Sequence, residues 1–299
     1  MIAPKARSLE AAQARAGRLF ILPSMVIFTA FVFLPLLASF AFSAFKIDMM
    51  FRTLEFQGMG NFARLLMDGR FWNALWNTLF YTVGLVPIQV VLALLAAVAL
   101  REQTKFNSFI KSVYFLPAIC SMTIISILWM FILNKNVGIF AYYLSRLGLS
   151  LPELLKSPTL AMPTIIAVGV WKNLGFNMVI LIAGLQGISD SYYEAADLDG
   201  ASAWHKLTRI TFPMLMPTLT FVTVNSVISS FQVFDQVFVM TGGGPLYRTE
   251  TVVQYIYNCA FTKFDRGYAS AVAVALLMIT LFVSAVLFRI MKKDEADLT

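Results

Sequence analysis

Four amide and hydroxyl side chains recur at helical spacing in the apolar run 212–238. They are Asn225, Ser229, Gln232 and Gln236. Their spacing of four, three and four residues places them on one face of a helix. Amides and hydroxyls donate and accept hydrogen bonds, as sugar hydroxyls do. The stripe therefore predicts a lining for a hydroxyl-rich solute, or alternatively a set of hydrogen bonds to a neighbouring helix.

A second polar group lies inside the apolar run 162–186. Lys172 is ten residues into this run, or about 15 Å at 1.5 Å per residue, near mid-depth in a bilayer core of about 30 Å. A charge there costs about 2.5–3.5 kcal/mol and needs a carboxylate, a group of carbonyls or water beside it. The alternative is a helix that starts later, with the ammonium group reaching the interface. The predicted solute path consists of Lys172, Asn173, Asn177, Asn225, Ser229, Gln232 and Asp235.

The sequence offers little for covalent catalysis or metal binding. His205 is the single histidine, and the two cysteines, Cys120 and Cys259, have no metal-ligand spacing. The glycine run at 241–245 lacks the strand and helix context of a phosphate loop. Neither a Walker lysine nor a nucleophile motif is present. We therefore expect a chain that is not an enzyme, binds no metal and holds no cofactor of its own.

A polar stretch of helical pattern separates two apolar runs, beginning Glu-Ala-Ala-Asp-Leu-Asp-Gly-Ala at Glu194. Ala195 and Ala196 put little bulk on one helical face, so that another backbone can approach closely. Gly200 can end a short helix in the left-handed conformation, and Ser202 can cap a second short helix. We predict a helix–turn–helix unit on the membrane surface that inserts into a partner.

The composition is that of an integral membrane protein. Apolar residues make up 59% of the 299 residues and charged residues 13%, against roughly 25% charged residues in soluble proteins. The net charge of +7 accompanies no basic–aromatic pattern typical of nucleic-acid binding. The long apolar runs lack a period of two, which favours helices over barrel strands. The six expected spanning helices cover 19–44, 72–100, 109–131, 162–186, 212–238 and 268–290.

Three separated motifs resemble the permease subunits of bacterial ABC importers, in the carbohydrate branch of the maltose and glycerol-phosphate type. The first is Glu-Ala-Ala, two residues, Asp-Gly-Ala at 194–201, followed by an Ile and by Pro-x-x-x-Pro at 213–217. The second runs from Gly-Asn-Phe to Trp-Asn-Thr over 60–78, and the third is Thr-Gly-Gly-Gly-Pro at 241–245. The resemblance covers nearly the whole chain and is to the smaller, six-span members of the family.

The resemblance implies an all-α type I permease fold with a cytoplasmic coupling helix. In that family the loop corresponding to about 187–211 docks into a cleft on an ATPase subunit. Glu194, Ala195 and Ala196 are then expected to carry the force and Asp199 and Gly200 to fix the turn. Ala201 completes the expected ATPase-coupling set. The implied partners are a second, unlike permease, two cytoplasmic ATPase subunits that bind ATP and Mg, an extracytoplasmic solute-binding protein and a carbohydrate.

The resemblance also places the chain in the bacterial inner membrane with both termini in the cytoplasm. The expected organisation is a cytoplasmic segment at 1–18, a six-helix permease domain at 19–290 and a cytoplasmic tail at 291–299. Two alternatives stay open. One is a secondary transporter driven by an ion gradient, with Lys172 and Asp235 as coupling charges. The other is an ABC permease for a non-sugar solute.

Overall fold

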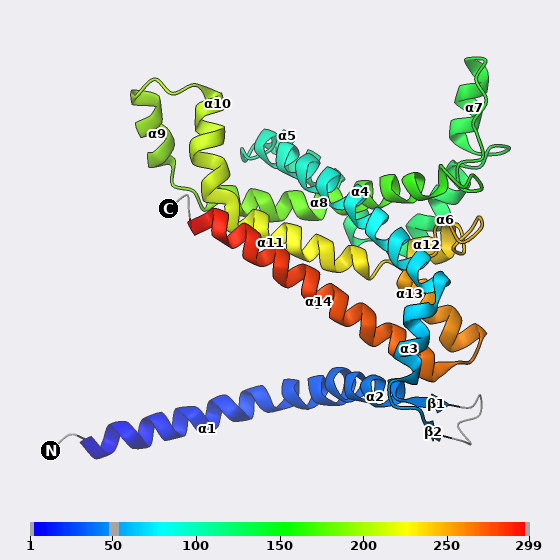
Figure 1. The fold of residues 1–299 in the computed structure, drawn as a ribbon. Helices are drawn as coiled ribbons and strands as arrows, with labels where there is room; N and C mark the ends of the chain where they lie inside the picture. The colour runs from blue at the N-terminus through cyan, green and yellow to red at the C-terminus, as the bar shows by residue number, and fades with distance from the viewer. Residues whose placement is uncertain (1–2, 48–53, 297–299) are drawn as a thin grey trace. The chain divides into compact units, whose positions relative to one another are not determined.

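The computed structural model describes residues 3–47 and 54–296 (Figure 1). The chain divides into two compact units. Unit 1 comprises the chain up to Met67 together with Cys259–Val274. Unit 2 comprises Asp68–Asn258 and the chain from Ala275 onward, so that the last long helix contributes to both units.

Unit 1 is built from a long helical stretch, a small hairpin and two further helical pieces. Its elements are α1 (Ala3–Phe28), the π-helical turn η1 (Thr29–Phe33), α2 (Leu34–Ser43), β1 (Phe45–Ile47), β2 (Leu54–Phe56), α3 (Gly60–Met67), the π-helical turn η3 (Asn258–Thr262) and the first part of α14 (Arg266–Ala296). The two strands pair antiparallel, with Phe45 opposite Phe56.

Polar side chains of α3 hold unit 1 together. The buried Asn61 amide donates to the carbonyls of Ser43 at 2.9 Å and Phe45 at 3.0 Å. The Arg64 guanidinium lies 2.6 Å from the Asp265 carboxylate and stacks over the ring of Tyr268. The Asn61 bonds span 18 and 16 residues of sequence, whereas Arg64 and Asp265 are 201 residues apart.

Unit 2 contains the remaining helices. They are α4 (Gly69–Ala99), α5 (Lys105–Ile119), α6 (Met122–Ile132), α7 (Ile139–Arg146), α8 (Ala161–Gln186), α9 (Asp190–Leu198), α10 (Ala203–Lys206), the π-helical turn η2 (Leu207–Thr211), α11 (Phe212–Phe231), α12 (Asp235–Met240), α13 (Val252–Tyr257) and the rest of α14. Helix α4 packs against α8 and α11, and α5 packs against α8.

Small residues allow the close packing of these helices. Ala93 and Ala97 of α4 are fully buried in a cluster with Leu181 of α8 and Leu215 of α11. A Cβ atom on Gly175 would overlap the main chain of Tyr114, so α5 and α8 approach as closely as their backbones permit. The core of unit 2 therefore lies where α4, α8 and α11 meet.

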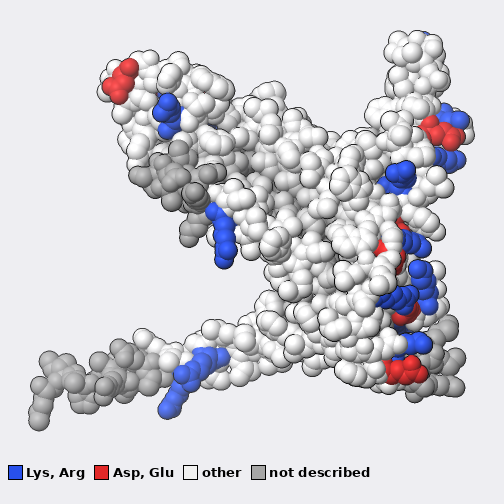
Figure 2. Space-filling model, viewed as in Figure 1, with Lys and Arg blue, Asp and Glu red and all other residues white. Residues whose placement is uncertain are grey.

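Within residues 3–47 and 54–296, five helical stretches are long and apolar enough to cross a membrane. They are Gln13–Ser43, Gly69–Ala99, Ala161–Gln186, Ala203–Phe231 and Arg266–Met291. A sixth span results if the bent pair α5 and α6 counts as one. On the face of unit 2 shown in Figure 2, charged side chains gather toward the helix ends and uncharged residues cover the middle. This distribution fits helices whose middle parts lie in hydrocarbon.

The span predicted over 109–131 is present, but it is not one continuous helix. Helices α5 and α6 meet at an angle of 101°. Between them Cys120 and Ser121 are extended, with ψ of 147° and 134°. Pro117 lacks an amide hydrogen, so the last turn of α5 already misses one main-chain hydrogen bond.

The prediction of one helix over 212–238 is also wrong. Helix α11 ends at Phe231 and α12 begins at Asp235, with Phe234 between them at φ −137° and ψ −63°. The Val233 carbonyl in the break accepts a hydrogen bond from the Thr251 hydroxyl at 2.9 Å. A loop distant in the sequence therefore compensates the lost helical bonding.

Candidate solute path and coupling loop

A cavity of about 160 Å³ lies among α4, α8 and α11. Its lining consists of Tyr81, Leu85, Gln89, Asn173, Phe176, Asn177, Asn225, Ser226, Ser229 and Ser230. Four predicted path residues therefore come together here, namely Asn173, Asn177, Asn225 and Ser229. Three others, Lys172, Gln232 and Asp235, do not line this cavity. The polar lining results from amides and hydroxyls contributed by three neighbouring spans.

Hydrogen bonds join the three helices on the buried side of the cavity. The side-chain amides of Gln89 and Asn177 both donate to the Ser226 hydroxyl, at 3.1 and 3.2 Å. The Ser230 hydroxyl lies 2.9 Å from that of Thr82. Among the residues that the structure describes, no partner is found for the buried side-chain oxygen of Gln89. An unsatisfied buried acceptor is costly, and its place beside the cavity favours a site that receives a donor.

The two sequence-based interpretations of the α11 stripe apply to neighbouring faces of the helix. Ser226 and Ser230 are buried and bond other helices, whereas Asn225 and Ser229 are exposed at the edge of the cavity. The stripe itself is interrupted, because Gln236 lies beyond the break, where it donates to the buried Tyr81 hydroxyl. Sequence reasoning missed Tyr81, Gln89, Ser226 and Ser230 as cavity residues, although a lone amide in an apolar run marks Gln89.

Lys172 finds a carbonyl instead of a carboxylate. Helix α8 begins at Ala161, so Lys172 lies well inside it and the alternative of a later start is wrong. The half-buried Lys172 ammonium donates to the Ala118 carbonyl at 3.4 Å. This carbonyl belongs to the last turn of α5, where the helix dipole is negative and the bend leaves carbonyls without helical partners. The bend in the third span thus supplies one acceptor for the Lys172 ammonium.

Residues 187–211, the coupling loop, fold as a helix–turn–helix (Figure 1). Helix α9 ends before Gly200, which has φ +71°, a conformation that disfavours other residues. The His205 amide donates to the Ser202 hydroxyl at 3.3 Å, so Ser202 caps α10 as predicted. One expectation is corrected: the second helix is not short, because α10 runs through η2 into α11 without a break.

The predicted docking face of the coupling loop is open. Glu194, Ala195 and Asp199 are exposed, and Ala196 and Ala201 are half-buried. Beside this face, Leu198 is 90% exposed. The geometry of the loop therefore agrees with insertion into another protein.

A second loop, 241–251, lies at the N-terminal end of α4 and is tightly bonded. Glu250 is 1% exposed and receives two hydrogen bonds from the Arg70 guanidinium, each of 2.7 Å. The Asn77 amide donates to the carbonyls of Tyr247 and Glu250 at 2.8 and 3.0 Å. Two motifs that were separate in the sequence, Trp-Asn-Thr at 76–78 and the glycine run at 241–245, therefore belong to one structural unit.

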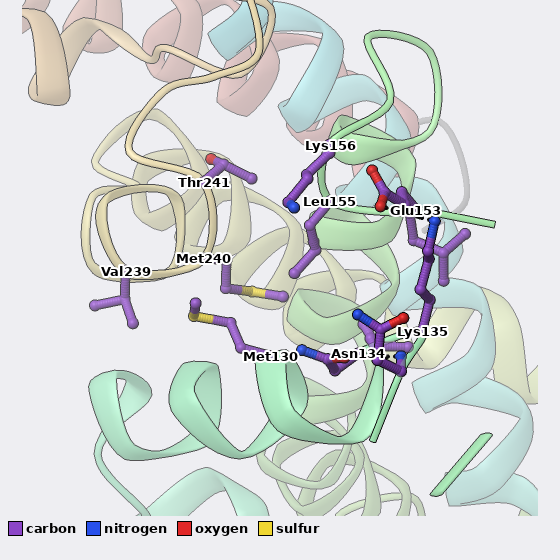
Figure 3. A pocket seen from close by; sticks show the side chains of 12 residues that line it. Met130, Asn134, Lys135, Glu153, Leu155, Lys156, Val239, Met240 and Thr241 are labelled. Atoms are coloured by element: carbon purple, nitrogen blue, oxygen red, sulfur yellow. Dashed lines mark hydrogen bonds and ion pairs between the residues drawn. The ribbon is translucent and has the colours of Figure 1, made fainter. Parts of the chain in front are cut away.

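A larger recess of about 460 Å³ borders this loop (Figure 3). Its lining includes Met130, Asn134, Lys156 and Thr241, and the Lys135 ammonium lies 2.9 Å from the Glu153 carboxylate. The hydrogen bond from Lys135 and the charges of Lys135 and Lys156 lower the pKa of the Glu153 carboxyl. The recess therefore combines an apolar floor with charged side chains at its edge.

Comparison with known proteins gives the family. The model of the family described as "Binding-protein-dependent transport system inner membrane component" matches residues 58–293. The chain belongs to this family. It is therefore a multi-pass inner membrane component of a transport system, and the resemblance inferred from the three motifs is confirmed.

Several curated relatives cover almost the whole chain. A probable ABC transporter permease protein, YurN of Bacillus subtilis, is 34% identical over 93% of this chain and 97% of its own length. The lactose transport system permease protein LacF of Rhizobium radiobacter is 34% identical over 88% and 89%. The trehalose/maltose transport system permease protein MalF of Thermococcus litoralis is 30% identical over 93% and 94%. All are permeases, so the prediction of a transport component and not an enzyme is confirmed.

A solved structure shows the same fold. It is a chain of a bacterial alginate ABC transporter crystallised with an alginate pentasaccharide-bound periplasmic protein. The TM-score is 0.79 at 22% identity, covering 93% of this chain and 94% of that one. The predicted all-α type I permease architecture is therefore confirmed. The ion-gradient alternative receives no support from any of these relatives.

Proposed function

We propose that the chain is one of two permease subunits of an ATP-driven importer for a sugar, an oligosaccharide or a polyol. The observation that carries the proposal is the cavity of amides and hydroxyls among α4, α8 and α11. Such groups match the donors and acceptors of a polyhydroxylated solute. Relatives named for lactose, for trehalose/maltose and for sn-glycerol-3-phosphate transport support the same class of solute.

The solute path is proposed to run along the exposed edge of α11. Asn225 and Ser229 face away from the bonded core of unit 2, and in hydrocarbon such groups require a polar partner or water. A second permease facing this edge would close the path, so that both subunits contribute to the lining. Lys172, Gln232 and Asp235 belong to the same proposal as residues of the path on either side of the cavity.

The coupling loop is proposed to dock into a cytoplasmic ATPase subunit through Glu194, Ala195 and Ala196, with Asp199 and Gly200 fixing the turn. Ala201 belongs to the same proposed coupling set. ATP and Mg are then bound by two such ATPase subunits, and an extracytoplasmic binding protein delivers the solute. This arrangement places the segment 1–18 and the tail 291–299 in the cytoplasm, on either side of the permease domain 19–290.

The test uses the complete importer in proteoliposomes, with radiolabelled uptake measured for a panel of sugars and polyols. Asn225→Ala and Ser229→Ala should each lower uptake of the transported solute severalfold, because a hydrogen bond to the solute is lost. Thr223→Ala is the matched control, since Thr223 is on the same helix but does not line the cavity. Uptake that is unchanged in both variants would assign these residues to packing and contradict the proposal.

A phosphorylated polyol is a second candidate within the same mechanism. The sn-glycerol-3-phosphate permease UgpA of Agrobacterium fabrum is 32% identical over 92% of this chain, and Lys172 places a cation inside α8. If the solute is anionic, Lys172→Gln should weaken competition by a phosphorylated polyol more than competition by its neutral analogue. Equal effects on both would exclude this candidate.

A further inference from the structure

Two hydrogen bonds join α9 to the helical stretch that follows it in the described part of the chain. The Lys206 ammonium lies 2.6 Å from the Asp197 carboxylate, and the Tyr193 hydroxyl lies 3.0 Å from that of Thr211. Tyr193 and Asp197 are four residues apart, so they lie on one face of α9. Both hydrogen bonds therefore start from the same face of α9.

The two hydrogen bonds from α9 end at the two ends of the π-helical turn η2. Lys206 precedes η2 directly and Thr211 is its last residue. Within this turn the Phe212 amide bonds the carbonyl of Leu207, five residues back. The Thr211 hydroxyl donates to the Lys206 carbonyl at 3.2 Å. This bond connects the Thr211 side chain to the main chain of Lys206, at the other end of the turn.

These contacts form a closed ring. Because Thr211 gives its proton to the Lys206 carbonyl, the Tyr193 hydroxyl is the donor in the contact between Tyr193 and Thr211. The ring runs from Tyr193 to Thr211, to Lys206 and to Asp197, and α9 itself closes it. A displacement of α9 therefore pulls on both ends of η2 at once.

Tyr193 also connects α9 to the rest of unit 2. Its ring packs against the buried cluster formed by α4, α8 and α11. The Arg101 guanidinium lies over this ring, 5.0 Å from its centre, just after the end of α4. Tyr193 is half-buried, while most of its neighbours on α9 are exposed. It thus links the open docking face to the buried cluster of unit 2.

We propose that Tyr193 and Asp197 are positioning residues that carry motion of α9 into α11 across η2. The proposal rests on the coupling role assigned to the loop above. Single π-helical turns inside α-helices are rare and occur frequently at functional sites. A widened turn lets α11 change direction relative to α10 while both keep their own hydrogen bonds. Since α11 carries Asn225 and Ser229, such a change reaches the solute cavity directly.

The test measures coupling in the complete importer with its binding protein and the transported solute. Tyr193→Phe removes only the hydroxyl and keeps the ring for packing and for Arg101. The number of solute molecules imported per ATP hydrolysed should fall about fivefold, the effect of losing one neutral hydrogen bond from the transmission step. The ATPase subunits should still copurify with the permease. Tyr192→Phe is the matched control, because Tyr192 is exposed on the same helix.

Substitutions of Thr211, which bonds the Tyr193 hydroxyl, give an independent check. Thr211→Val should lower the same ratio as Tyr193→Phe, whereas Thr211→Ser keeps the hydroxyl and should restore it. Thr211→Val also removes the hydrogen bond to the Lys206 carbonyl. The double variant Tyr193→Phe with Thr211→Val should therefore be no worse than Thr211→Val alone, since that substitution already removes the bond to Tyr193. Additive losses in the double variant would contradict the proposed ring. A wild-type ratio of solute imported to ATP hydrolysed in Tyr193→Phe would also contradict it.

The failure of this inference can be told apart from failure of the proposed function. If Gly200→Asp leaves the ATPase subunits bound, the loop is not the docking site and the proposed coupling role is wrong. If Gly200→Asp releases them while Tyr193→Phe imports normally per ATP, only the ring is wrong. Loss of the ATPase subunits from Tyr193→Phe would also overturn the inference, because Tyr193 would then shape the docking face.

Discussion

The loops at the two ends of α4 differ in how much of each loop is buried and bonded. At the N-terminal end, loop 241–251 encloses Glu250 almost completely and bonds it to Arg70. At the C-terminal end, the coupling loop is exposed and touches α4 through the Arg101 guanidinium and the ring of Tyr193. With 31 residues, α4 separates the two loops by about 46 Å at 1.5 Å per residue. They therefore lie on opposite sides of the bilayer that α4 spans.

The difference concerns how firmly each loop is fixed. Breaking a buried charge pair costs about 3–5 kcal/mol, because it leaves one charge unpaired. Exposed pairs such as Lys206 and Asp197 contribute about 0–1 kcal/mol. One loop is therefore fixed by a buried charge pair, whereas the other is held by an exposed pair and by the contacts of Tyr193. A loop that transmits motion must be able to shift relative to the core, and weak, exposed contacts such as those of the coupling loop allow this.

The largest expected effect is on the rigid loop. Glu250→Ala leaves the Arg70 guanidinium without its carboxylate and should destabilise the permease by about 3 kcal/mol. Thermal unfolding in detergent should show a midpoint several degrees lower. Arg248→Ala is the matched control, because Arg248 is exposed in the same loop. An unchanged midpoint for Glu250→Ala would remove the contrast between the two loops.

The next effect concerns the docking face. Gly200→Asp puts a charged side chain at φ +71° in the proposed contact with the ATPase subunit. Copurification of the ATPase subunits should fall about tenfold, because the new carboxylate lies in the proposed contact and loses its water there without gaining a partner. Gly148→Asp is the matched control, because Gly148 has φ +72° with open space around it but lies outside the loop. Equal losses in both variants would indicate a general folding defect.

The smallest expected effect concerns the exposed ion pair of the coupling loop. Asp197→Asn removes the charge from the exposed pair with Lys206 and should lower import per ATP about twofold. The difference from wild type should shrink as salt rises from 0.05 to about 0.5 M, because exposed charges are screened. The readout is the ratio of uptake to ATP hydrolysis at each salt concentration. A twofold loss that persists at high salt would mean that Asp197 acts through shape instead of charge.

Local features of the coupling loop were predictable from the sequence because they depend on adjacent residues. Gly200 and Ser202 specify a turn and a cap whatever surrounds them, and the structure contains both. The break after Phe231 was not predictable in this way. It is stabilised by the Thr251 hydroxyl bonding the Val233 carbonyl, across 18 residues. Apolar periodicity continues through such a break and gives no sign of it.

The candidate site was predicted only in part for the same reason. Asn173 and Asn177 were found because an amide in an apolar run is conspicuous. The pairing of Asn177 with Ser226 depends on how α8 and α11 pack, and a lone serine in an apolar helix carries no signal of its partner. Lys172 was recognised as a charge that needs a polar partner. The Ala118 carbonyl that bonds it is available because α5 ends at a bend, which the sequence did not indicate.

Transport by reconstituted vesicles tests the central claim most directly. The chain is placed in proteoliposomes with its second permease, its ATPase subunits and the binding protein, or alone with a proton or sodium gradient. We predict accumulation of labelled sugar or polyol in the complete system when ATP is supplied on the ATPase side, and none by the chain alone. Accumulation by the chain alone, driven only by the ion gradient, would contradict the account.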